Sequence, residues 1–262
     1  MSQTPRVQRL RQQSLDAVES LSSERAELMT EFYRQQGNRL VSTPVQRALA
    51  FQYLMEHKTV CINDGELIVG EKGPVPKAAP TFPELCCHSL SDLDILDSRE
   101  KTTFKVSEHT RQAYENTVIP FWEGRSMRDL IFQEMTPAWK AAYEAGIFTE
   151  FMEQRAPGHT VADDKIYRLG MLDFQTQIES RLASLDFLHD PQAYARQEEL
   201  KAMHIAAGAL IRFGERHAEK ARQLSGQESD PQRRAELEQI AEVCAWVPAN
   251  APRSFWEALQ YY

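Results

Sequence analysis

Helix-start signals recur along this chain and constrain its fold more than any other feature. Capping side chains followed directly by proline recur along the chain, for example at Thr43-Pro44, Thr136-Pro137, Asp190-Pro191 and Asp230-Pro231. The cap oxygen accepts an otherwise unpaired backbone N–H, and proline suits the first helical turn because it has no N–H to leave unpaired. Two further starts have the spacing of a capping box, Ser126 with Asp129 and Ser254 with Glu257. The chain is therefore expected to be mainly helical.

Apolar residues recur at helical spacing after these starts and give the extents of the expected helices. We expect helices at residues 24–36, 44–57, 107–122, 126–135, 136–145, 169–188, 190–225, 230–243 and 254–262. Residues 1–20 are only weakly amphipathic, which predicts a frayed or docked helical arm. Alanines beside Gly208 predict close packing of the helix that contains them.

One stretch breaks the helical pattern. Residues 59–62 and 66–69 are short apolar runs joined by Asn63-Asp64-Gly65. Asn and Asp tolerate positive φ and Gly favours it, so this stretch predicts a small β-hairpin at residues 59–69. Residues 70–83 contain four prolines, which predicts an extended, irregular segment because proline removes backbone donors.

Composition and charge narrow the class of protein. The 262 residues are 42% hydrophobic and 26% charged, the balance of a globular domain, and the net charge of -8 argues against a general nucleic-acid binder. No apolar run approaches the ~18 residues of a membrane span, and the N-terminus lacks the apolar core of a signal peptide. A cytoplasmic protein is therefore expected. The four cysteines lack the spacing of a zinc site or a disulfide framework, which predicts reduced thiols.

The stretch from Phe148 to Val161 is the candidate functional loop, because chemically capable side chains are densest there. It holds the ionisable residues Glu150, Glu153 and Arg155, the aromatic Phe151, and His159 after a Pro-Gly pair. Arg155 is suited to a carboxylate ligand or to an ion pair within the loop. His159 is suited to proton exchange or to a structural hydrogen bond. Phe151 is suited to a pocket wall or to the core.

The residues alone leave two classes of function open. The chain contains no GxGxxG, GxxxxGK[ST], HExxH or GxSxG pattern. No motif therefore indicates a nucleotide-binding protein, a zinc protease or a serine hydrolase. An enzyme with its site in the 148–161 loop and a non-catalytic helical scaffold both fit the pattern.

The final helix ends without a stop signal. Residues 254–262 have a capping box at the start but no glycine, basic last turn or proline at the end. Because isolated short helices are marginal, we expect the 262 residues to be the N-terminal part of a longer protein. By itself this part is expected to expose apolar surface, partly through Trp256, Leu259, Tyr261 and Tyr262.

Several segments in order resemble a known family. They are INDGELIVGEKG at 62–73, APTFPELCCHS at 79–89, VSEHTRQAYENTVIPFWEGRSMRD at 106–129, MTPAWKAAYEAGIFTEFMEQRAPGHTV at 135–161 and VPANAPRSFWEALQYY at 247–262. Together they resemble the N-terminal region of glycyl radical enzymes of the pyruvate formate-lyase-like family. The resemblance is strongest to the trans-4-hydroxy-L-proline dehydratase branch.

The resemblance implies a fold and a chemistry. Residues 1–262 would be the N-terminal part of the family domain, a helical shell around a ten-stranded β/α barrel, with the radical-bearing C-terminal part absent. The resemblance implies a radical on a C-terminal glycine, installed by an activating enzyme with S-adenosylmethionine and an iron-sulfur cluster. It also implies a thiyl cysteine that removes a substrate hydrogen atom, so that hydroxyproline loses water. A homodimer is implied for the full-length protein.

Two residues match positions that line the substrate pocket in that branch. Phe151 and His159 are the implied substrate-binding residues, and His159 is the implied catalytic group that protonates the departing hydroxyl. Cys86-Cys87 do not correspond to the adjacent catalytic cysteines of pyruvate formate-lyase, which lie in the middle of the longer chain. Related branches act on dihydroxypropanesulfonate, small diols or hydroxyphenylacetate, and these remain alternatives, as does an inactive fragment.

Overall fold

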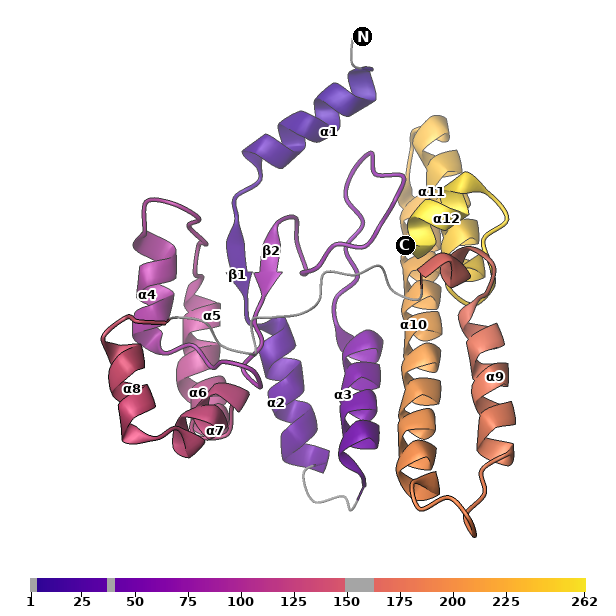
Figure 1. The fold of residues 1–262 in the computed structure, drawn as a ribbon. Coiled ribbons are helices and arrows are strands. Elements are labelled where there is room, and N and C mark those ends of the chain that lie inside the picture. The colour runs from indigo at the N-terminus through magenta and orange to yellow at the C-terminus, as the bar shows by residue number, and fades with distance from the viewer. Residues whose placement is uncertain (1–3, 37–40, 149–162) are drawn as a thin grey trace. The chain divides into compact units, whose positions relative to one another are not determined.

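The computed structural model describes residues 4–36, 41–148 and 163–262, which fall into two compact units (Figure 1). Unit 1 comprises Met1–Ala17, Phe32–Pro76 and Val161–Tyr262, and unit 2 comprises Val18–Glu31 and Lys77–Thr160. Helix α2 (Glu24–Gln36) starts in unit 2 and ends in unit 1. The expectation of a mainly helical chain is confirmed.

Unit 1 is built on one long helix. Helix α10 (Ala193–Gln227) has 35 residues and packs against α3 (Thr43–His57), α9 (Met171–Ala183) and α11 (Pro231–Trp246). The unit also contains α1 (Pro5–Asp16), a 3-10 helix (Asp163–Tyr167) and α12 (Phe255–Tyr261). In the part of the chain that the structure describes, no helix combines the length and apolar character needed to cross a bilayer.

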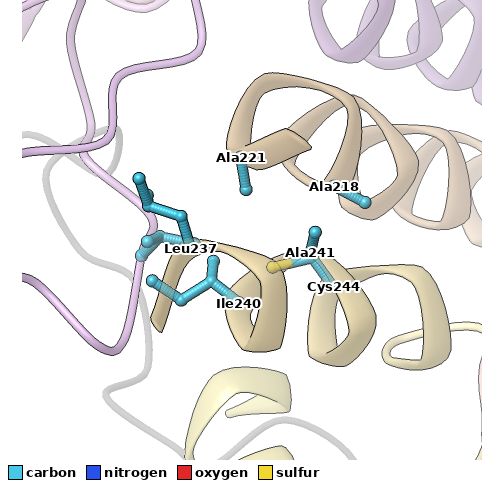
Figure 2. Packing of buried hydrophobic residues seen from close by; sticks show 7 residues of the cluster. Ala218, Ala221, Leu237, Ile240, Ala241 and Cys244 are labelled. Carbon is cyan, nitrogen blue, oxygen red and sulfur yellow. The ribbon is translucent and has the colours of Figure 1, made fainter. Parts of the chain in front are cut away.

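Small residues on α10 allow its neighbours to approach closely. Ala218 and Ala221 of α10 face Leu237, Ile240, Ala241 and Cys244 of α11, and Val69 completes the buried cluster (Figure 2). A second cluster joins Ala202 of α10 to Val45 and Ala48 of α3. A Cβ at Gly214 would lie 2.7 Å from Pro248 Cδ, so this contact requires glycine. The prediction of close packing along this helix is confirmed.

The predicted hairpin at residues 59–69 is wrong: the structure has no strand there. Side chains from α11 and α12 bind its backbone instead. Val69 N–H donates to Gln260 Oε1 and Gln260 Nε2 donates to Val69 O, both at 2.8 Å. Trp256 Nε1 donates to Leu67 O at 2.9 Å.

Arg233 of α11 holds the turn of the same stretch. Its Nη1 donates to Glu66 O at 2.8 Å and its Nη2 to Asn63 O at 3.1 Å. Buried backbone groups require partners, and here distant side chains supply what a strand pair would have supplied. The conformation of residues 63–69 is therefore decided by side chains distant in the sequence and not by pairing of its two apolar runs.

The expected N-terminal arm is a docked helix. Thr4 caps α1, which has no buried residue, so apolar packing contributes little to holding it. Arg6 pairs with Glu236 of α11 and donates to Gly65 O. The arm is thus held to unit 1 by polar contacts.

Unit 2 combines a small sheet with short helices. Strands β1 (Ser20–Ser22) and β2 (Ala78–Pro80) are parallel, in the register Ser20↔Ala78. The helices are α4 (Leu90–Ser98), α5 (Glu108–Ala113), α6 (Ile119–Trp122), α7 (Met127–Glu134) and α8 (Pro137–Glu144). Residues 70–83 were expected to form an irregular segment, and the structure shows that they include the short strand β2.

A π-helical turn, Tyr114–Val118, joins α5 to α6. The Ile119 N–H bonds to Tyr114 O, five residues back, in place of the usual four. A proline ring in a regular α-helix clashes with the carbonyl four residues earlier. The wider turn accommodates Pro120, so the helix reaches Trp122, the end expected from the sequence.

The predicted helix starts are largely confirmed. Ser126, Thr136, Asp230 and Ser254 each accept a backbone N–H of the first turn. The N-cap position of α3 is Ser42, one residue earlier than expected, and its side chain makes no capping hydrogen bond. Helix α10 begins at Ala193.

The expectation that the C-terminal residues expose apolar surface is confirmed in part. Leu259 and Tyr262 are exposed, whereas Trp256 packs against the α10–α11 cluster and the Tyr261 hydroxyl donates to Leu169 O. Trp256 and Tyr261 therefore contribute to unit 1 rather than to its exposed surface.

We expect Arg233→Met to lower the free energy of unfolding by about 2–4 kcal/mol, because it leaves two carbonyls and a carboxylate without their buried cation. The neighbouring Arg234 is exposed and donates to Glu228 O, so Arg234→Met serves as the control and should change stability by less than about 1 kcal/mol. Urea unfolding measures both. Equal losses in the two variants would contradict the role given to Arg233.

Acid should weaken the protein through His217. Burial lowers the pKa of His217, which lies near Lys58 and Arg216 and hydrogen-bonds Phe213 O. The unfolded chain takes the proton first, near pH 6.5, so this contribution to stability is complete above that pH and is lost as the pH falls towards the lower folded pKa. When the free energy of unfolding is measured from pH 8 to pH 5, it should fall less steeply in His217→Gln than in the unsubstituted protein. A residual slope is expected from His88, whose pKa burial also lowers.

Candidate functional site

The predicted site residues lie outside the described residues. Phe151 and His159 fall in the segment 149–162, as do Glu150, Glu153 and Arg155. Their assignments stay predictions. The structure instead describes how the chain reaches this segment and how it leaves it.

Helix α8 ends at the start of the loop with a glycine cap. Gly146 has φ +72°, the left-handed conformation that glycine adopts without a Cβ penalty. The Gly146 N–H bonds to Tyr143 O at 2.9 Å, and the Ile147 N–H bonds to Ala142 O at 3.0 Å. This pair of bonds is the Schellman motif, which fixes the direction of the chain after a helix.

Aromatic rings hold the residue that follows. Phe148 meets Trp139 edge-on at 5.2 Å between centroids and lies 5.9 Å from the ring of Tyr143. Tyr143 in turn contacts Phe132, and its hydroxyl accepts a hydrogen bond from Arg128 at 3.0 Å. The start of the loop is therefore anchored within unit 2.

The chain after the loop is anchored within unit 1. The 3-10 helix buries Ile166, and Gly170 then passes against the backbone of Ala249 and Asn250. A Cβ on Gly170 would lie 2.2 Å from Ala249 O, so no other residue fits. The Met171 N–H donates to Pro248 O at 2.8 Å, which pins the first turn of α9 to the segment after α11.

A second group of reactive side chains surrounds Cys86, Cys87 and His88 in unit 2. All three are half-buried rather than fully buried as small core residues would be. Burial raises the pKa of Cys87 to about 12 and lowers the pKa of His88. In the described ranges, no three His, Cys, Asp or Glu side chains gather as a metal would require.

Sequence reasoning missed the partner of Cys86. Arg128 Nη1 donates to Cys86 Sγ at 3.4 Å although the residues are 42 positions apart. The Arg128 N–H bonds to Leu85 O at 3.0 Å, which brings the start of α7 against the Cys86 segment. The Ser126–Asp129 capping box locates α7, but no local signal identifies what the helix packs on.

The family model described as pyruvate formate lyase-like matches residues 1–262. Trans-4-hydroxy-L-proline dehydratase of Clostridioides difficile is 50% identical over 258 residues, covering 98% of this chain and 32% of that enzyme. The chain thus spans about a third of that relative's length.

Solved structures agree with the sequence matches. The crystal structure of hydroxyproline dehydratase from Clostridioides difficile with substrate trans-4-hydroxy-L-proline bound gives a TM-score of 0.94 at 49% identity, covering 100% of this chain and 33% of that one. The glycerol-bound B12-independent glycerol dehydratase from Clostridium butyricum gives 0.90 at 30% identity, again covering 100% and 33%. Because the family model matches residues 1–262 of this chain, the chain belongs to the pyruvate formate lyase-like family.

Proposed function

We propose that residues 1–262 form the N-terminal part of a glycyl radical eliminase that dehydrates trans-4-hydroxy-L-proline. The observation that carries the proposal is the 50% identity to trans-4-hydroxy-L-proline dehydratase over 98% of the chain. Identity to the glycerol dehydratase is 30%, although both structures match over the whole chain. Because the fold is shared, the difference in identity favours hydroxyproline over a small diol.

The radical chemistry would come from groups outside residues 1–262. When present, a glycine radical and a thiyl cysteine supply the removal of a hydrogen atom from the substrate. An activating enzyme that uses S-adenosylmethionine and an iron-sulfur cluster would install the radical. We further propose that the full-length protein is a cytoplasmic homodimer, as the family resemblance implies.

This chain would contribute the proton that lets the hydroxyl leave. Hydroxide is a poor leaving group, and an imidazole with a pKa near 6.5 is suited to donating a proton at neutral pH. His159 is assigned that role, so that the hydroxyl departs as water and pyrroline-5-carboxylate remains. Phe151 is assigned to the pocket wall, where an apolar ring helps to exclude water.

The described ends of the loop support a positioned site. Catalytic groups act efficiently when a rigid scaffold holds the segment that carries them. The glycine cap at Gly146, the rings around Phe148 and the close passage of Gly170 each fix one end of the 149–162 segment within its own unit.

We expect His159→Gln in the activated full-length protein to lower turnover of trans-4-hydroxy-L-proline roughly 10²–10⁴-fold, the usual effect of losing a general acid. His189→Gln is the control, because His189 is exposed and pairs with Asp186 in the α9–α10 turn. Electron paramagnetic resonance should find equal glycyl radical in both variants. Turnover in His159→Gln equal to that of the control would contradict the assignment.

The glycine cap before the loop gives a second test. Gly146→Ala forces a side chain into the left-handed region, which costs about 1–2 kcal/mol, and should shift the loop and lower kcat. Gly226→Ala is the control, since Gly226 lies near the end of α10 with open space around it. Steady-state kinetics on both variants measure the effect. An unchanged kcat in Gly146→Ala would show that the position of the loop does not depend on this cap.

A further inference from the structure

Helix α1 belongs to unit 1 although it buries none of its side chains. Every residue of α1 apart from Arg6, Leu10 and Gln13 is exposed, and the apolar residues Val7 and Leu15 keep 46% and 66% of their surface open to solvent. Burial of apolar surface usually contributes most to the docking of a helix, and here that contribution is small. Polar contacts must therefore do most of the work of holding α1 in place.

Two arginines of α1 make these contacts. Arg6 and Arg9 are three residues apart and so lie on one face of the helix. Arg6 pairs with Glu236 of α11, and its Nη1 donates to Gly65 O at 3.4 Å. The hydrogen bond from Arg6 is the main reason why the pKa of Glu236 is lowered, so this carboxylate stays charged. Arg9 lies so close to Gly65 that a Cβ there would be 2.7 Å from Arg9 Nη2.

The helical conformation of α1 depends on this docking. A helix of 12 residues is marginal by itself in water. The charges of α1 also oppose the helix dipole, since Arg6 lies in the first turn and Asp16 in the last. When its contacts with unit 1 are lost, α1 should therefore unfold rather than move away as an intact helix.

The contacts that hold α1 lie beside a cavity that water and salt can enter. The cavity has a volume of about 560 Å³ and lies between α1, the turn at residues 63–65 and the start of α11. Most of its lining residues are charged, among them Arg6, Arg9, Asp64, Glu228 and Glu236. A polar space of this size is suited to water, and dissolved salt screens charges over about 10 Å at 0.1 M and about 3 Å at 1 M. Contacts between partly exposed charges therefore weaken as the salt concentration rises.

We propose that α1 is a salt-sensitive strap, which opens and unfolds while the rest of unit 1 stays folded. Low ionic strength favours the docked helix, and rising ionic strength weakens the contact of Arg6 with Glu236 and releases residues 4–16. Opening uncovers the charged cavity and the turn at residues 63–65. This inference does not depend on the proposed dehydration.

The surface under the strap keeps its conformation when α1 leaves. Arg233 donates to Asn63 O, Trp256 to Leu67 O and Gln260 to Val69 O. These donors come from α11 and α12, so residues 63–69 do not need α1 to stay in place. The strap therefore opens onto a preformed surface.

The test is hydrogen–deuterium exchange of the native full-length protein, read by mass spectrometry at about 50 mM and about 1 M sodium chloride. We expect the α1 amides to exchange about fivefold faster or more at the higher salt, relative to the unfolded chain in the same buffer, because screening weakens the ion pair. Helix α3, which buries Val45, Ala48, Ala50 and Leu54, is the reference. Its amides, and those of residues 63–69, should change by less than about twofold.

Two variants separate the ion pair from a general effect of salt. Arg6→Gln should raise α1 exchange about fivefold or more at low salt and remove most of its salt dependence, since the paired cation is lost. Arg11→Gln is the matched control, because it removes the same charge from an exposed position on the same helix and should keep slow, salt-dependent exchange.

Three results would overturn the proposal. The first is α1 exchange that does not respond to salt in the unsubstituted protein. The second is equal α1 exchange in Arg6→Gln and Arg11→Gln. The third is loss of protection in α1 and α3 together at high salt, because α1 would then not open by itself.

Discussion

The packing of unit 1 depends on the small residues along one face of α10. Ala218, Ala221 and Gly214 let α11 and the following Pro248 approach the helix backbone. The same close approach aligns α11 and α12 so that Arg233, Trp256 and Gln260 reach the backbone of residues 63–69. Larger side chains on this face of α10 would displace α11, because packed interiors leave little space for extra atoms.

The two anchors of the 149–162 segment use local chemistry of different kinds. On the unit 2 side a glycine cap and a set of edge-on rings fix Phe148. On the unit 1 side Gly170 passes against Ala249 and Asn250 where a side chain would not fit. Both anchors use glycine where another residue would be strained or excluded. A loop held in this way at both ends is a suitable carrier for catalytic side chains.

Local signals predicted the helical part of the fold well. Ser126, Thr136, Asp230 and Ser254 cap helices as expected, because a cap is decided within four residues. The hairpin prediction failed because the side chains that bind the backbone of residues 63–69 lie about 170–190 positions later in the sequence. Short apolar runs do not reveal whether a neighbouring strand or a distant side chain will pair with them.

The assignment of the site rests on other signals and stays a prediction. The density of charged and aromatic residues in 148–161 pointed to the loop, and family resemblance selected Phe151 and His159 within it. The contact of Arg128 with Cys86 had no counterpart in the sequence pattern, since a capping box locates a helix but not the surface it packs on. Cys86 and Arg128 thus emerge only from tertiary contacts.

Turnover by the full-length protein after anaerobic activation decides between hydroxyproline and a small diol as the substrate. Trans-4-hydroxy-L-proline and glycerol would be supplied separately, with pyrroline-5-carboxylate and the dehydrated diol product quantified. We expect pyrroline-5-carboxylate from hydroxyproline and little or no turnover of glycerol. Activity on glycerol with none on hydroxyproline, in protein shown to carry the glycyl radical, would contradict it.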